Sequence, residues 1–336
     1  MAKEKYFDWC YGANFYPSTA INQLEMWQAD SFDEETIDRE LGFAQKIGMT
    51  IMRVYLHDLL FEQDAPGFFK RMERYLAIAD SHNIKTMFVF FDDCWKNEFS
   101  LGRQPDPLPF THNSGWVQSP GDKAADDPAQ RPRLKKYVQS VLEHFGADKR
   151  VVLWDLYNEP GNGCSGDNNI KKEMRTNKSL PLLKDVFAWA REVAPDQPLT
   201  AGAWLFDASF DDINKFVFDN SDLVTFHCYA LPEHTEERIQ RIKAVAGNRQ
   251  ILCSEYLART INCTISNCLP IYKKHNISAI NWGLVSGKSQ TIFPWNWNQE
   301  KGMPEKCFHD IFNPDGTLLH PEEQSTFDAV NPLLHF

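Results

Sequence analysis

The segment VVLWDLYNEP, residues 151–160, joins an apolar run to a polar and charged end. Residues 151–158 are nearly all apolar, as expected for a parallel strand that is covered on both faces. Asn158, Glu159 and Pro160 follow at its end. The segment therefore predicts a buried strand that delivers an amide and a carboxylate to one edge of a sheet.

Seven further runs of this kind occur at residues 11–17, 50–56, 86–91, 198–204, 223–229, 251–256 and 279–285. Segments with helical periodicity lie between them at 33–48, 67–83, 133–145, 180–193, 235–247 and 265–275. Asp33 and Thr235 are predicted N-caps, and Gly48 and Gly247 predicted helix ends. Eight strands alternating with helices predict a single (β/α)8 TIM barrel over residues 1–336. A doubly wound sheet is the alternative, but it would need a glycine-rich phosphate loop after an early strand, and none is present.

Three connections are much longer than the others, at residues 92–128, 161–178 and 286–306. Long loops in compact domains are usually functional. All three follow the carboxyl ends of predicted strands, where the active sites of α/β barrels are built. We therefore expect the functional site at this end of the barrel.

The composition excludes several classes of partner. The net charge of −11 argues against nucleic acid and against an anionic membrane surface, both of which attract basic proteins. No apolar stretch approaches the roughly 20 residues that span a bilayer. Ten Trp residues are more than a core of this size needs, so part of them are expected to line a binding cleft and the rest to be ordinary core residues.

The N-terminal residues contain charges but no apolar run before the first strand, so they do not resemble a secretory signal. The eight Cys residues are dispersed and form no CxxC pair. These features favour a reducing cytoplasm, whereas a secreted or periplasmic location would apply if a leader had been trimmed. The sequence leaves the oligomeric state open.

Two glutamates stand at matching positions, Glu159 after the fourth predicted strand and Glu255 at the end of the seventh. These strands face each other across an eight-stranded barrel. Two such carboxylates can flank a glycosidic bond, with retention of configuration at a separation of about 5–5.5 Å and inversion at about 6.5–9.5 Å. The structural alternatives are a helix cap or a pair with an arginine for Glu159, and an ion pair for Glu255.

The Asn-Glu-Pro after the fourth strand and the Glu that ends the seventh resemble glycoside hydrolase clan A, in particular the cellulase-like and xylanase-like enzymes of family 5. Four further correspondences occur in order along the barrel: Arg53, Asn158, the pair His227 and Tyr229, and Trp282. The resemblance implies that Asn158 holds the sugar 2-hydroxyl, that Tyr229 lies near the nucleophile, and that Trp282 forms the floor of the subsite where the bond breaks. It also matches Arg53 and His227, and it implies a retaining mechanism with Glu159 as acid/base and Glu255 as nucleophile.

Physical arguments support some of these roles directly. Arg53 can donate paired hydrogen bonds to Glu255 and keep this carboxylate ionised, which is compatible with a structural ion pair inside the barrel. His227 and Tyr229 are two residues apart on a strand and therefore share one face. For His227 and Trp282 the alternative is an ordinary core position.

A wider set of polar and aromatic residues follows the other strands, where each can contact sugar or merely pack a loop. Flat sugar faces pack on aromatic rings while hydroxyls take polar partners, so both types are expected in a sugar cleft. The predicted substrate-binding residues are Asn14, His57, Asp92, Trp95, Trp204 and Trp295. Asp58, Asp93, His112, Asn113, Trp116 and the remainder of the segment 288–297 are further candidates.

Neither a cofactor nor a metal ion is expected. The segment GLVSGKS, residues 283–289, resembles a phosphate loop but has three residues between its glycines instead of four. The sequence has no HxH or HExxH pattern, which a barrel-type metal hydrolase would need.

The two glutamates thus predict double displacement on β-glycosidic bonds. The resemblance to cellulases and β-1,4-xylanases implies plant-type polysaccharides or oligosaccharides as the substrate. The same two glutamates would serve an exo-acting β-mannosidase, β-galactosidase or arabinofuranosidase. Whether the enzyme is exo- or endo-acting depends on whether the loops at 92–128 and 286–306 block one end of the cleft. Two alternatives from other classes are a non-catalytic carbohydrate-binding barrel and a TIM-barrel enzyme of unrelated chemistry.

Overall fold

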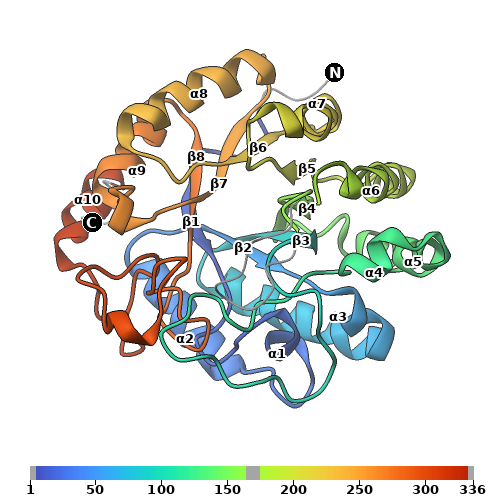
Figure 1. Cartoon of the computed structure of the whole chain (residues 1–336), viewed down its shortest axis with the longest axis horizontal. Coiled ribbons are helices and arrows are strands. Elements are labelled where there is room, and N and C mark those ends of the chain that lie inside the picture. The colour runs from blue at the N-terminus through green and yellow to red at the C-terminus, as the bar shows by residue number, and fades with distance from the viewer. Residues whose placement is uncertain (1–4, 164–174, 332–336) are drawn as a thin grey trace.

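Eight parallel strands form a nearly closed barrel with helices around it, in a computed structural model that describes residues 5–163 and 175–331 (Figure 1). The strands are hydrogen-bonded in the order β5-β4-β3-β2-β1-β8-β7-β6. A parallel bridge between Ala203 and Phe226 brings the two outer strands together. The predicted TIM barrel is confirmed. The strands are β1 (Tyr11–Asn14), β2 (Ile51–Tyr55), β3 (Lys85–Asp92), β4 (Val151–Asn158), β5 (Leu199–Gly202), β6 (Val224–His227), β7 (Ile251–Tyr256) and β8 (Ser278–Trp282).

The described helices include all six that the sequence predicts, with shifted ends. They are α1 (Gln23–Trp27), α2 (Glu34–Lys46), α3 (Asp58–Ser81), α4 (Asp122–Asp126), α5 (Arg131–Phe145), α6 (Leu180–Val193), α7 (Asp211–Asn220), α8 (Pro232–Ala246), α9 (Ile265–Lys274) and α10 (Gln324–Val330). Helix α3 begins well before residue 67, because a helical turn at Asp58 is merged with it across a kink at Asp64. Helix α7 was not predicted, since its short sequence mixes Asp and Asn with aromatic and β-branched residues that are weak helix formers.

The predicted helix ends are confirmed at three of four positions. Asp33 accepts from the backbone N–H of Thr36, and Gly48 and Gly247 adopt positive φ angles of 80° and 61° after their helices. The predicted cap at Thr235 is wrong. Helix α8 starts at Pro232, whose ring fixes the φ angle that a first helical residue needs.

The barrel interior is apolar at one end and polar at the other. A small cluster of buried side chains, with Tyr6 and Phe7 packed against it, fills the interior near the amino ends of the strands; it consists of Ile51, Met87, Leu153, Leu223, Leu252 and Ile280. Further along the same strands, Arg53 and Asp155 are also fully buried. This apolar layer closes the amino end of the barrel, and the polar side chains lie toward the carboxyl ends of the strands.

Two of the three long loops are described in full. The loop after β3 contains the short helix α4 and pairs with the strand end through Asp92 and Ser119. Residues 164–174 of the predicted loop 161–178 lie outside the described residues. Within the described part of the chain, no helix has both the length and the apolar composition that a membrane crossing requires.

Candidate active site

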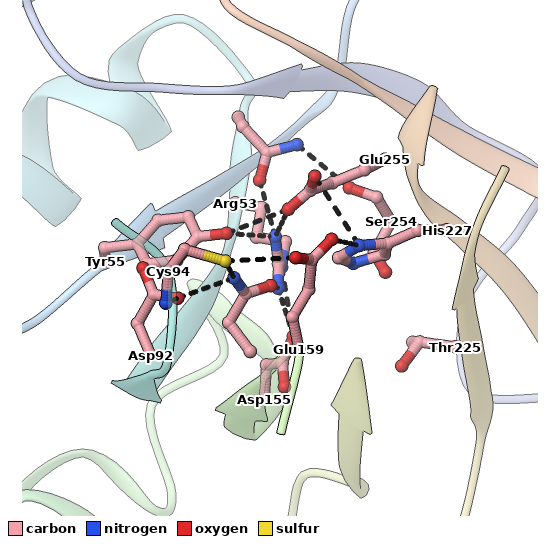
Figure 2. A network of polar contacts seen from close by, with 12 residues as sticks. Arg53, Tyr55, Asp92, Cys94, Asp155, Glu159, Thr225, His227, Ser254 and Glu255 are labelled. Carbon is pink, nitrogen blue, oxygen red and sulfur yellow. Dashed lines mark hydrogen bonds and ion pairs between the residues drawn. The ribbon is translucent and has the colours of Figure 1, made fainter. Parts of the chain in front are cut away.

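Glu159 lies directly after β4 and contacts side chains from β6, from the loop after β3 and from its own loop (Figure 2). Its backbone has a φ angle of 43°, which costs energy in a residue with a side chain and is typical of functional positions. Its Oε1 lies 2.6 Å from Nδ1 of His227. Its Oε2 accepts from the Cys94 thiol at 3.0 Å and from the side-chain amide of Asn162.

Glu255, near the end of β7, accepts hydrogen bonds on both carboxylate oxygens. Arg53 Nη1 at 2.8 Å and the Tyr55 hydroxyl at 3.0 Å donate to Oε1, and the Tyr229 hydroxyl donates to Oε2 at 2.8 Å. Burial raises the pKa of the Glu255 carboxyl above its ordinary value of 4.5; His227 opposes this shift and Glu159 adds to it. The donors around Glu255 fix it in position and stabilise its charged form.

The two carboxylates face one another across the barrel mouth. One oxygen of Glu159, one oxygen of Glu255 and a ring nitrogen of His227 all lie within 4.8 Å of one another. Carboxyl groups in inverting glycosidases are about 6.5–9.5 Å apart, to leave room for a water molecule. The nearest oxygens of the pair are closer than the separation typical of an inverting arrangement.

Arg53 is the centre of a buried network beneath the two glutamates (Figure 2). Its guanidinium donates to Asp155 at 2.7 and 3.0 Å as well as to Glu255. It also donates to the side-chain oxygens of Asn14 at 2.8 Å and Asn158 at 2.6 Å. One cation thus compensates two buried carboxylates and orients the amide beside Glu159.

A cavity of about 270 Å³ opens above the two glutamates. Its wall combines both carboxylates with indole rings and polar side chains, as expected of a sugar-binding site. The lining residues are Cys94, Trp95, His112, Asn113, Asn158, Glu159, Asn162, Trp204, Tyr229, Glu255, Trp282, Trp295 and His309.

Glu159, His227 and Glu255 are also close enough to ligate a metal ion. The donor set does not fit this role well. Arg53 and two phenols already donate to Glu255, and the guanidinium places a positive charge 2.8 Å from the carboxylate that would bind the cation. The arrangement is better suited to proton transfer and nucleophilic attack than to a metal centre.

Comparison with known proteins assigns the family. Residues 42–286 match the family model described as cellulase, glycosyl hydrolase family 5. The chain belongs to this family. The resemblance predicted from the sequence is confirmed, and the protein is a glycoside hydrolase. A search of the curated proteins finds no match to the chain.

Solved structures of family 5 proteins share the fold of this hydrolase. A GH5_18 protein from Streptomyces cattleya in complex with Manβ1-4GlcNAc has a TM-score of 0.67 at 11% identity, covering 96% of this chain and 80% of that chain. The exo-β-1,4-mannosidase from Opitutaceae bacterium strain TAV5 has a TM-score of 0.62 at 16% identity, with coverages of 97% and 60%. An endo-1,4-β-mannanase from Rhizomucor miehei has a TM-score of 0.61 at 13% identity, covering 96% of this chain and 95% of that chain. At these identities the likeness shows the fold alone.

Most of the residues predicted from the sequence come together in the hydrolase. The structure places Glu159, Glu255, Asn158, Trp95, Trp204, Tyr229, Trp282 and Trp295 in the cavity wall. Arg53 lies beneath Glu255, and His227 lies beside both glutamates without lining the cavity. His112 and Asn113 of the long loop also reach the wall.

Three predicted sugar contacts, Asn14, His57 and Asp92, lie behind the cavity wall, so the structure corrects their placement. All three are buried and none lines the cavity. The Asn14 amide donates to the backbone oxygen of Ser254 at 2.9 Å. His57 accepts from the first turn of α3, and Asp92 accepts from Asn158 at 2.8 Å. These side chains are already hydrogen-bonded to other parts of the protein, so they stabilise the structure behind the cavity wall.

Sequence reasoning missed several residues of this network. Tyr55 and Asp155 were identifiable, because Tyr55 is two residues after Arg53 on one strand face and Asp155 is a charge within an apolar run. Cys94 and Asn162 carry no local signal, since each reaches Glu159 from a loop. His309 enters the wall from far along the chain, and nothing in its neighbourhood indicates this.

The raised pKa of Glu255 predicts the acidic limb of the pH–rate profile. A carboxylate that acts as a nucleophile must be ionised, and a raised pKa means that Glu255 takes up its proton at a higher pH than an ordinary glutamate. We expect kcat/KM to decline on the acid side with an apparent pKa above 4.5. Tyr55→Phe should move this limb further upward, because it removes a donor to the carboxylate. A limb at or below 4.5, in enzyme that stays folded by circular dichroism, would contradict the prediction.

Arg53→Ala is expected to damage both stability and activity. It leaves Asp155 and Glu255 without their common cation, and breaking a buried ion pair costs about 3–5 kcal/mol of unfolding free energy. We expect kcat/KM to fall about 10²–10³-fold as well, as when one positioned donor is lost from an active site. Urea unfolding and steady-state kinetics measure the two effects. Full activity in the folded variant would show that the reaction does not need Arg53 to position Glu255 or to stabilise its charge.

Proposed function

We propose that this family 5 hydrolase cleaves β-glycosidic bonds with retention of configuration. The observation that carries the proposal is the unequal environment of two carboxylates within 4.8 Å of each other. Glu255 is fixed by Arg53 and two phenols, which suits a nucleophile that is ionised at the start. Glu159 has different partners, the imidazole of His227 at 2.6 Å and the Cys94 thiol at 3.0 Å.

In the first step, Glu255 attacks the anomeric carbon while Glu159 transfers its proton to the departing oxygen. This forms a covalent glycosyl-enzyme and releases the leaving group as an alcohol. In the second step, Glu159 takes a proton from water, and the resulting hydroxide displaces Glu255 from the anomeric carbon. Two inversions give net retention. Asn158 lies in the wall beside both carboxylates, where it can bind the sugar 2-hydroxyl.

We further propose that the enzyme is exo-acting. The loop after β3 is hydrogen-bonded to α1, where Gln23 donates to the backbone oxygen of Val117 at 2.9 Å, and also to the loop after β8. The backbone N–H of Asn113 donates to Ser289 at 2.8 Å, His112 Nδ1 lies 2.7 Å from the Phe293 oxygen, and the N–H of Phe110 donates to Gln290 at 2.9 Å. These contacts support a closed wall on one side of the cavity.

The closed wall lies on the side where the glycon must sit. Glu159 protonates the leaving group, so we place the aglycon past Glu159, near Trp204, whose indole donates to the backbone oxygen of Pro160 at 3.4 Å. In this orientation the glycon takes the part of the cavity that Trp282 and His112 line. A cavity of about 270 Å³ is small and has room for a single sugar ring. This favours the exo-acting alternative over a polysaccharide-cleaving endo-enzyme.

The experiment begins with a panel of aryl glycosides, to identify the sugar. β-Mannosides come first because a solved relative of the same fold is named an exo-β-1,4-mannosidase, followed by glucosides, xylosides, galactosides and arabinofuranosides. Proton NMR of the best pyranoside should show the β-anomer as the first product. An initial α-anomer from a β-substrate would mean inversion and would reject Glu255 as nucleophile.

Exo-action is tested on oligosaccharides of the same sugar with the reducing end reduced to an alditol. We expect free monosaccharide and alditols that shorten one unit at a time. Free disaccharides or longer free oligosaccharides among the early products would show cleavage inside the chain and reject the exo proposal, while leaving the retaining mechanism intact.

A further inference from the structure

We propose that Cys94 is a positioning residue for proton transfer, whose thiol donates a hydrogen bond to the carboxylate that Glu159 becomes as it protonates the leaving group. This inference rests on the acid/base role proposed for Glu159. It adds a group that acts through Glu159, from a loop that the sequence predicts to be functional but at a residue that the sequence did not single out.

The thiol is placed by the end of β3. Cys94 is two residues past the end of this strand, and its backbone N–H donates to Asp92 Oδ1 at 2.8 Å. Asp92 is itself anchored, because Trp116 donates to its other oxygen at 2.8 Å. In Figure 2 the sulfur of Cys94 points at Glu159, and Sγ lies 3.0 Å from Oε2. The position of the sulfur is therefore fixed by the barrel.

The surrounding amides indicate which way the thiol proton points. The side-chain amides of Asn158 and Asn162 both donate toward Sγ, each at 3.4 Å. With two N–H groups directed at its lone pairs, the sulfur accepts on that side and donates its proton toward Glu159. A thiol is a weak donor in general, but a bond to an ionised acceptor is stronger than one between neutral groups.

In the first step of the proposed reaction, a hydrogen-bond donor to Glu159 would stabilise the carboxylate that forms there. As Glu159 gives up its proton, negative charge builds on its carboxylate, and a donor to Oε2 stabilises this charge most in the transition state. The other oxygen, Oε1, lies 2.6 Å from Nδ1 of His227. The benefit depends on how much proton transfer the leaving group needs. A thiol that acts through Glu159 should therefore matter for poor leaving groups and little for activated ones.

The test compares Cys94→Ala, which removes the donor, with Cys94→Ser, which keeps one. For a substrate with a poor leaving group, we expect kcat/KM of the alanine variant to fall on the order of tenfold. For a dinitrophenyl glycoside it should stay within about twofold, and the serine variant should stay within about threefold on both. Should the alanine variant not fold, Cys94→Val removes the donor while filling more of the thiol's volume.

The pH–rate profile gives a readout that a purely structural role would not move. A lost donor destabilises the carboxylate of Glu159, so the alkaline limb of kcat/KM should shift to higher pH in the alanine and valine variants. Cys10→Ala, at the opposite end of the barrel, is the matched control and should leave both limbs unchanged. Cys10 lies at the start of β1, where its thiol contacts Ser278.

Two results would overturn the inference. One is an equal loss of activity on good and poor leaving groups in the alanine variant, and the other is an alkaline limb that does not move. Glu159→Gln distinguishes this failure from that of the proposed function. If Glu159→Gln is selective for poor leaving groups while Cys94→Ala is not, the acid/base role stands and only the role of Cys94 falls.

Discussion

Replacing Glu255 with glycine is expected to lower kcat about 10⁴–10⁶-fold, the loss typical of removing a covalent nucleophile. Water in the vacated space cannot replace a carboxylate that Arg53 and the hydroxyls of Tyr55 and Tyr229 hold in position. Azide is small and anionic, so it should enter that space and attack the anomeric carbon of an activated β-glycoside. The product should be the α-glycosyl azide, because only one inversion then occurs.

The azide product identifies the role of the residue. An α-glycosyl azide, detected by proton NMR together with restored turnover, assigns Glu255 as the nucleophile. Glu40→Gln is a matched control, because Glu40 is also fully buried but lies on α2 and accepts from Ser18 outside the cavity. This control should keep wild-type activity. Substantial residual activity in folded Glu255→Gly without azide would refute the assignment.

Glu159→Gln is expected to slow hydrolysis of substrates with poor leaving groups by about 10²–10⁴-fold, the usual contribution of general acid catalysis. A glutamine has the shape of the carboxyl group but no proton to transfer. With a dinitrophenyl glycoside the first step should be nearly unaffected, because that leaving group departs without protonation. The glycosyl-enzyme should then accumulate, since water lacks its base, and a burst of released phenol should precede a slow steady state.

Added azide discriminates this variant from Glu255→Gly. Azide needs no base, so it should attack the accumulated glycosyl-enzyme and give the β-glycosyl azide, the opposite anomer. The burst amplitude measured by stopped-flow absorbance reports the first step directly. Equal losses on good and poor leaving groups, with no burst, would rule out Glu159 as the acid/base.

The barrel and the two glutamates were predictable because their signals are local. A strand that is buried on both faces needs a continuous apolar run, and such runs occur wherever the structure has a strand. Glu159 and Glu255 stand at the ends of their runs, and barrel geometry brings the ends of β4 and β7 to one mouth. Arg53 was identifiable for the same reason, as a charge in the middle of an apolar strand.

The surroundings of the site depend on contacts that no local pattern records. Asn14, His57 and Asp92 have the residue types of sugar ligands, yet bonding within the protein engages each of them behind the wall. Helix α7 forms although its residues favour helix weakly, because its buried face, including Ile213 and Val217, packs against the barrel. Packing outweighs intrinsic propensity at such positions.

The sequence by itself determined the number and order of the strands, the two carboxylates and the cation beneath them. An apolar run and the polar residues at its end are both made of neighbouring residues, so a single stretch such as 151–160 is enough to predict a strand and the side chains at its end. Only the tertiary structure decided the shape of the cavity and the partners of Glu159. The hydrogen bond between His112 and Phe293 joins residues that are 181 positions apart in the sequence. The thiol of Cys94 contacts Glu159, which is 65 positions away. Such contacts depend on how loops settle on a completed barrel, because their free energy comes from packing and hydrogen bonds between distant segments.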